Sequence, residues 1–271
     1  MNKKFSAVVL AGERPGRSDF SRELGLAASV LVNVAGKSAL ARVIEALESS
    51  ESVEAGVLCG PAQNVFQENP EFQQILEGSS FRWMAPKLGP SASALAGIEQ
   101  LNSFPTLLTA GDHALLTAGL VDSFCTRALD LDVDVDVVFG LAPYSIVRAA
   151  FPETKRTVLK FSDGQYCGTN LFAILSPDGK AGPAFWSRVE ADRKRPWRMV
   201  RRMGLGVGLS MLLRYLLGRL TLDSVLDSLS RVMGCRVGCV LLDEPRVAVD
   251  VDSVADRDLA ERVLLGESSR G

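Results

Sequence analysis

The chain has 271 residues, of which 47% are hydrophobic and 23% charged, with a formal net charge of −2 at pH 7. That length is enough for one large α/β domain with a full core. The balanced charge excludes the strongly basic class of nucleic-acid-binding proteins. The five cysteines lack metal-ligand spacing, and the apolar run at the start is too short for a signal peptide or a spanning helix. We therefore expect a reduced, cytoplasmic protein.

The first half of the chain alternates strand and helix patterns. Residues 5–10 are apolar and β-branched and predict a strand that ends at Ala11 and Gly12. Short strands are then expected near residues 30–34, 57–59 and 81–84, each followed by a helix, and residues 107–111 form the next strand. Thr117 is placed to cap the helix after it. This alternation predicts βαβ units and hence an α/β fold with a mostly parallel, doubly wound sheet in three layers.

The loop after the first predicted strand is suited to phosphate. Gly12 and Gly16 let backbone amides approach a ligand closely, and the guanidinium groups of Arg14 and Arg17 match phosphate oxygens. The alternative is an ordinary glycine-rich turn whose arginines are only solvated.

A carboxylate follows the buried strand at residues 107–111. Asp112 is expected at the carboxyl edge of the sheet, where α/β proteins bind ligands, which is a suitable place for an acid that holds a metal. The alternative is that Asp112 and His113 only shape a strand-to-helix turn.

The middle of the chain predicts further strands. Four aspartates at 130, 132, 134 and 136 alternate with apolar residues, which predicts a strand with one solvated acidic face rather than a calcium loop. Residues 156–161 and 170–175 predict two strands that are joined as a hairpin.

Residues 182–234 differ in character and are expected to form a helical insertion within a single domain of residues 1–271. Basic residues crowd positions 188–202, and residues 204–220 are mostly apolar. Three hypotheses follow: a basic pocket for an anionic substrate, an element that contacts a membrane surface or a lipid-linked acceptor, or helices that pack on the sheet with solvated arginines. The glycines in this stretch argue against a continuous spanning helix.

The end of the chain predicts a second carboxylate site. Asp250 and Asp252 alternate on a strand expected at residues 247–252, so both side chains would face one way. Ser253 and Asp256 then predict a capping box for a last helix.

Together these segments resemble a known family, the MobA-like nucleotidyltransferases, whose GT-A type fold is also used by nucleotide-sugar pyrophosphorylases. The matching stretches are Val9–Gly12 with Arg17, Val34–Lys37, Gly111–Asp112 with Leu115–Thr117, and Val249–Ala260. The resemblance implies magnesium-dependent transfer of a nucleotidyl group from an NTP to a phosphorylated acceptor such as a sugar phosphate, a phospho-alcohol or a cofactor precursor, with release of pyrophosphate.

The resemblance also implies roles for individual residues. Arg17 and Asp112 would be catalytic, and Asp112 would hold Mg²⁺ with Asp250 or Asp252. The nucleotide would be bound by Leu10, Ala11, Gly12, Arg14, Gly16, Ser91 and Ser93. The acceptor would be bound by Lys160, Thr169, Asn170, Arg193 and Lys194.

Three positions depart from the family pattern. Glu13 replaces a glycine of the first loop, Ser29 stands where the family has a lysine, and His113-Ala114 replaces a segment that normally contains a proline. A carboxylate near a triphosphate is repulsive, and loss of a lysine weakens transition-state stabilisation. One alternative is therefore a catalytically degenerate nucleotide-binding or regulatory protein. Another is a GT-A glycosyltransferase that uses the Asp-x-Asp spacing of Asp250 and Asp252.

Overall fold

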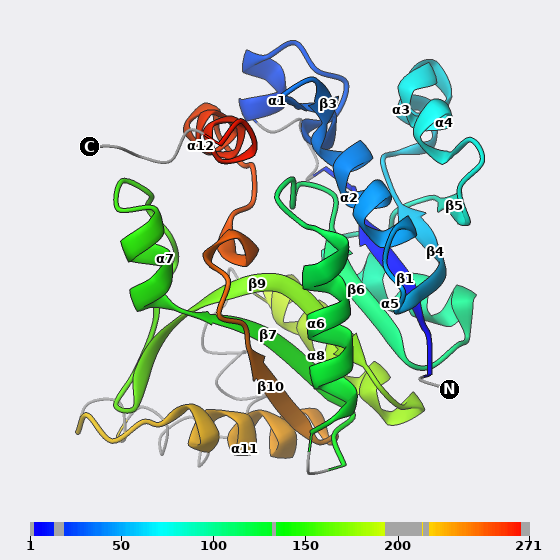
Figure 1. The fold of residues 1–271 in the computed structure, drawn as a ribbon. Helices are drawn as coiled ribbons and strands as arrows, with labels where there is room; N and C mark the ends of the chain where they lie inside the picture. Colours follow the sequence, from blue (N-terminus) through cyan, green and yellow to red (C-terminus); the bar gives the residue numbers. More distant parts are fainter. Residues whose placement is uncertain (1–2, 14–18, 132–133, 193–212, 214–216, 267–271) are drawn as a thin grey trace.

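The computed structural model describes residues 3–13, 19–131, 134–192, 213 and 217–266. In this part of the chain an eight-stranded sheet has the order β10-β7-β9-β6-β1-β4-β5, and β8 pairs with β9 (Figure 1). The strands are β1 (Phe5–Leu10), β4 (Val53–Cys59), β5 (Phe81–Met84), β6 (Thr106–Ala110), β7 (Val137–Pro143), β8 (Leu159–Phe161), β9 (Gly164–Ile174) and β10 (Val237–Leu241). A separate small hairpin consists of β2 (Asn33–Val34) and β3 (Lys37–Ser38).

The direction of the strands fixes where the chain changes course. β1 is parallel to both β4 and β6, whereas β9 is antiparallel to β6 and to β7. From β1 the chain moves outward through β4 to β5, and it then returns to place β6 on the other side of β1. The predicted mostly parallel, doubly wound sheet is confirmed. The topological switch point, where such sheets bind ligands, lies between the carboxyl ends of β1 and β6.

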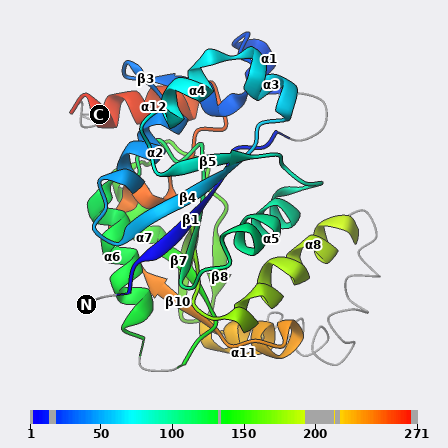
Figure 2. The same cartoon turned by 90° about the vertical axis from the view of Figure 1, so that its right-hand side faces the viewer.

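Helices cover both faces of the sheet (Figure 2). One face packs against α5 (Pro90–Leu101), α8 (Ala181–Asp192) and α11 (Leu222–Met233). The other packs against α2 (Ala39–Glu48), α6 (Ala118–Leu129) and α7 (Tyr144–Ala150). The three-layer α/β architecture therefore agrees with the sequence.

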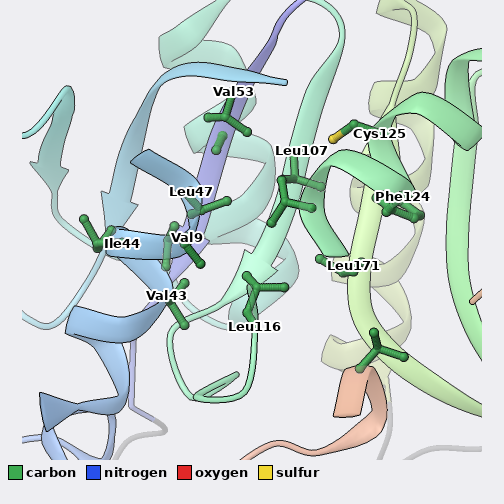
Figure 3. Packing of buried hydrophobic residues seen from close by; sticks show 14 of the residues in the cluster. Val9, Val43, Ile44, Leu47, Val53, Leu107, Leu116, Phe124, Cys125 and Leu171 are labelled. Carbon is green, nitrogen blue, oxygen red and sulfur yellow. The ribbon is translucent and has the colours of Figure 1, made fainter. Parts of the chain in front are cut away.

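The alternation of side chains along β1 separates the two halves of the core. Val9 lies beside Leu47 of α2 in Figure 3, and both belong to the buried cluster that also contains Phe124 of α6. Its neighbour Val8 points the other way and packs with Ile98 of α5. Because both faces of β1 are buried, the strand is a continuous apolar run in the sequence.

Two expected elements differ from the structure. The single helix expected after the strand near residues 57–59, around residues 63–76, is two helices, α3 (Gln63–Glu68) and α4 (Pro70–Leu76), because Asn69 takes the extended conformation that a following proline favours. The acidic strand expected around residues 130–136 is wrong: Asp130 caps the end of α6 and β7 begins only at Val137. Asp136 is buried and accepts hydrogen bonds from the Ser176 hydroxyl and the Arg236 amide.

The last predicted strand is also wrong. Residues Pro245–Ala248 form a 3-10 turn, η3, and no strand is assigned to residues 249–252. One half of the capping box predicted for the final helix, α12 (Val254–Leu264), is confirmed, because the Ser253 hydroxyl accepts a hydrogen bond from the Asp256 amide at 3.2 Å. Shorter helical elements are α1 (Asp19–Glu23), η1 (Ser29–Leu31) and η2 (Pro177–Lys180).

The region expected as a helical insertion begins and ends with helices. α8 and α11 are helices, but most of the basic and apolar residues between them lie outside the described residues, so the insertion stays a prediction. Among the helices that the structure describes, none is both long enough and apolar enough to cross a membrane.

Candidate nucleotide and metal site

The backbone at the end of β1 is held in place from two sides. The amide of Gly111 donates a hydrogen bond to the carbonyl of Leu10 at 2.8 Å, which joins the ends of β6 and β1. Gly60, at the end of β4, has a φ of +106°, and a Cβ atom there would lie 2.6 Å from the Gly12 nitrogen. Only glycine fits this position. Leu10, Ala11 and Gly12 therefore form a fixed turn at the topological switch point.

Glu13 is engaged by the protein itself. Its Oε1 atom accepts a hydrogen bond from the Ser29 backbone amide at 2.6 Å. Glu13 and Ser29, two of the three departures from the family pattern, thus contact each other. The Glu13 carboxylate has a backbone hydrogen-bond donor. Arg14, Gly16 and Arg17, which were predicted to contact the nucleotide, lie outside the described residues.

Asp112 lies directly after β6, where its side chain is partly buried. Its Oδ1 atom is shielded from solvent and has no hydrogen-bond partner in the described part of the chain. Burial first, and then the nearby charges of Asp252 and Asp250, raise the pKa of this carboxyl to about 7. The Asp112 carbonyl accepts a hydrogen bond from the Val251 amide at 3.1 Å. The last segment of the chain is therefore attached directly to the β6 edge.

Asp250 already has partners for both of its oxygen atoms. Oδ1 accepts a hydrogen bond from Nη1 of Arg156 at 2.6 Å, and Oδ2 accepts one from Nδ2 of Asn170 at 3.4 Å. Asp252, two residues later, is exposed. Of these two aspartates, Asp252 has the larger effect on the pKa of Asp112.

Asn170 reaches this cluster because of an irregularity in β9. The register between β7 and β9 shifts between Phe139 and Leu141, and Asn170 has a φ of +53°. A Cβ on Gly140, opposite the shift, would lie 2.3 Å from Oγ1 of Thr169. Strained or left-handed residues are frequent at binding sites, and here the strain turns the Asn170 amide toward Asp250.

The remaining acceptor residues lie in different surroundings. Thr169 is buried, and its hydroxyl has no partner among the described residues. Lys160 is exposed on β8, opposite Gln165 in the β8–β9 hairpin. Arg193 and Lys194 fall outside the described residues, so their predicted role stays a prediction.

His113 is completely shielded from solvent beside Asp112. Burial lowers the pKa of its imidazole to about 4, against the opposing effects of the Asp250 charge and the Arg246 carbonyl. The ring is therefore neutral at pH 7. This burial indicates that His113 packs inside the loop beside the site.

The serines expected near the nucleobase, Ser91 and Ser93, both lie in the first turn of α5. The Ser93 hydroxyl accepts a hydrogen bond from the Lys87 amide at 2.9 Å and donates one to the Gly89 carbonyl at 3.0 Å. The Ser91 hydroxyl donates to Oε1 of Glu190 on α8 at 2.7 Å. Both hydroxyls have protein partners, and contact with a base stays a prediction.

The comparison with known families decides the identity of the fold. The model of the MobA-like NTP transferase domain matches residues 7–156, which is more than half of the chain. The chain belongs to this family.

Several solved structures have a fold similar to that of this chain. A hypothetical transferase from Thermus thermophilus is 28% identical with a TM-score of 0.75, over 94% of this chain and 99% of that one. The 4-diphosphocytidyl-2C-methyl-D-erythritol synthase from Anaerococcus prevotii is 12% identical with a TM-score of 0.58, over 97% and 96% of the two chains. A CMP:2-keto-3-deoxy-manno-octonic acid synthetase, solved with CTP, is 14% identical with a TM-score of 0.57, over 98% and 100%. No curated protein matches the sequence.

The structure of this NTP transferase adds two residues that the sequence did not single out. Arg156 and Glu190 each contact a predicted site residue, namely Asp250 and Ser91. Arg156 was expected at the start of a strand, whereas it lies in the loop before β8. No local pattern marks either residue, because each partner is more than 90 positions away in the chain.

Proposed function

We propose that this NTP transferase moves a nucleoside monophosphate group from an NTP to a small phosphorylated acceptor, with Mg²⁺ bound and pyrophosphate released. The observation that carries the proposal is the Asp112 carboxyl. It lies at the topological switch point, beside the fixed turn of Ala11 and Gly12, and close to the charges of Asp250 and Asp252. Clustered carboxylates next to a phosphate-binding turn suit a cation that bridges protein and phosphate.

The donor set fits magnesium. Carboxylate oxygens are its preferred protein ligands, and Mg²⁺ normally keeps several waters and binds one or two carboxylates together with substrate phosphates. In the described part of the chain, no three acidic, histidine or cysteine side chains are arranged to hold a metal by themselves. Asp112, with its unpartnered buried Oδ1, and the exposed Asp252 would hold the ion, and Asp250, whose oxygens contact Arg156 and Asn170, lies beside them.

In the proposed mechanism the protein mainly binds and orients. The Ala11 amide is engaged by the Cys59 carbonyl at 2.9 Å, so the Gly12 amide would face the triphosphate, with Arg14, Gly16 and Arg17 of the same loop around it. A bound Mg²⁺ would neutralise charge on the α-phosphate. The acceptor oxygen attacks the α-phosphorus, the bond to the β-phosphate oxygen breaks, and pyrophosphate leaves. Lys160, Thr169, Asn170, Arg193 and Lys194 are the residues that we propose for the acceptor.

Two contacts favour this function over the alternatives. Glu13 and Ser29 were together the reason to suspect a degenerate site. The Glu13 carboxylate accepts a hydrogen bond from the Ser29 amide, which answers the first of these two points by giving the carboxylate a structural partner. The glycosyltransferase alternative needs both aspartates of Asp250-x-Asp252 for a metal, yet Asp250 is paired with Arg156. An active nucleotidyltransferase is the better supported proposal.

Pyrophosphate release tests the proposal. The wild-type protein is incubated with Mg²⁺, each of the four NTPs, and a panel of sugar phosphates and phospho-alcohols. We expect turnover with one NTP, and its loss in Asp112→Asn but not in Asp130→Asn, which makes the same chemical change at an exposed position. Absence of turnover together with absence of NTP binding by calorimetry, for protein shown to be folded, would contradict the proposal.

A further inference from the structure

Arg156 is a nearly buried cation between two carboxylates. Its side chain is 9% exposed, and it lies in the loop between α7 and β8. Nη1 donates to Oδ1 of Asp250 at 2.6 Å, and Nη2 donates to Oδ1 of Asp256 at 2.7 Å. The planar guanidinium thus uses two of its nitrogens on two different acids, which a lysine cannot do with the same geometry.

The two acids lie on either side of Asp252 in the sequence. Between them the chain is fixed by the Val251 amide, which donates to the Asp112 carbonyl, and by Ser253, which caps α12. Arg156 therefore ties together both ends of the segment that carries Asp252. Figure 1 shows α12 on the same side of the sheet as the loop between β6 and α6, where Asp112 lies.

The segment needs such a tie because its charges repel those beside it. The Val251 amide donates to the Asp112 carbonyl at 3.1 Å, so the segment that carries Asp250 and Asp252 lies directly against Asp112. Without an opposing charge, like-charged groups on an irregular segment lower their energy by moving apart. Arg156 neutralises Asp250 and pairs with Asp256, so that Asp252 can remain near Asp112.

We propose that Arg156 is a positioning residue that holds Asp252 opposite Asp112, so that these two carboxylates share one divalent cation. The proposal rests on the function proposed above and deepens it. Asp250 is then the link between Arg156 and the cation site. Partners that orient a metal ligand typically change metal affinity about 10- to 100-fold when they are replaced.

Charge and geometry predict opposite results for a variant, which makes the proposal testable. Removing the positive charge of Arg156 makes the cluster more negative, so electrostatics alone would tighten the binding of a cation. Loss of positioning weakens it instead. Arg156→Gln removes both the charge and the bridge, whereas Arg156→Lys keeps the charge and can bond only one carboxylate well. Arg148→Lys and Arg148→Gln, on the exposed surface of α7, are matched controls.

The experiment measures Mn²⁺ binding to the nucleotide-free protein by electron paramagnetic resonance. We expect Mn²⁺ affinity to fall at least about tenfold in Arg156→Gln, by a smaller factor in Arg156→Lys, and not at all in the Arg148 variants. In turnover, the KM for Mg²⁺ should rise more than the KM for the NTP. Unchanged or tighter Mn²⁺ binding in Arg156→Gln overturns the proposal, as does wild-type affinity in Arg156→Lys.

Hydrogen exchange separates this inference from the proposed function. The proposed cation site is wrong if the wild-type protein binds no Mn²⁺, or if the Asp112→Asn variant binds Mn²⁺ with the same affinity as the wild type. The exchange rate of the Val251 amide then still tests the positioning role, because that amide donates to Asp112. We expect exchange at least about tenfold faster in both Arg156 variants than in the Arg148 controls. Equal rates overturn the positioning role.

Discussion

Asp112 should destabilise the protein at neutral pH, and Asp112→Asn should remove that cost. Burial first, and then the charges of Asp252 and Asp250, raise the pKa of the carboxyl from 3.8 to about 7. One pH unit between the folded and unfolded pKa corresponds to about 1.4 kcal/mol, so the complete effect is about 4 kcal/mol. The partial contact of Asp112 with solvent reduces the expected gain in unfolding free energy to about 2–3 kcal/mol.

The sign of the effect follows from the two pKa values. In the unfolded chain Asp112 ionises near pH 3.8, whereas in the folded protein it ionises near pH 7. Between these values the folded state binds one more proton, so the unfolding free energy falls as the pH rises, and the cost is complete above pH 7. Asparagine does not ionise. Asp112→Asn should therefore be more stable than wild type at pH 8 and no more stable at pH 4.

His113 should oppose this trend in the same pH range. Burial lowers the pKa of its imidazole from 6.5 to about 4, so the unfolded state binds the proton first as the pH falls. Its contribution to stability is complete above pH 6.5 and is lost toward pH 4. The opposite slopes of His113 and Asp112 should largely cancel in the wild-type protein. Asp112→Asn should expose the His113 slope, and stability should then rise between pH 4 and 6.5.

Urea unfolding in EDTA between pH 4 and 8.5 measures both effects. Asp130→Asn is the matched control, because it replaces an exposed aspartate at the end of α6. A curve for Asp112→Asn that runs parallel to the wild-type curve would refute the assignment of a raised pKa to this carboxyl. At pH 8, saturating Mg²⁺ should stabilise the wild type by about 3 kcal/mol at 100 times its Kd and leave Asp112→Asn unchanged.

Three further substitutions test other contacts. Burial raises the pKa of Asp122, but hydrogen bonds from two serines lower it more. Asp122→Asn should therefore reduce the free energy of unfolding in urea by about 1 kcal/mol at pH 7, and this deficit should disappear well below pH 4. Equal deficits at both pH values would contradict this. Gly60→Ala should destabilise by more than about 1 kcal/mol in thermal unfolding and weaken NTP binding in calorimetry, because its Cβ would meet Gly12; normal NTP affinity would show that this turn is not used. Glu190→Ala should raise the KM for the NTP about severalfold by releasing Ser91, whereas Glu190→Gln keeps the acceptor and should stay near wild type; equal values in both variants would argue against the contact.

The sequence by itself determined the class of fold and its family. The apolar runs of β1 and β6, and the helical period of residues such as Leu40 and Leu47, predicted alternating strands and helices because burial imposes these periods locally. The position of Asp112 after a buried strand placed it at the ligand-binding edge. The alternation of polar and apolar residues that predicts a strand was misleading at residues 130–136. The same period of two occurs there in a connection that is held by side-chain hydrogen bonds.

Only the tertiary structure decided how the site is assembled. The order of the strands brings β9, antiparallel, beside β6, and with it Asn170. It also brings the Asp250–Asp256 segment to Asp112, although no strand is assigned to residues 249–252. Arg156 is separated from Asp250 and Asp256 by 94 and 100 residues. Local patterns do not encode contacts between residues so far apart in the chain. Such contacts depend on how the whole sheet packs, which determines which charged side chains come together.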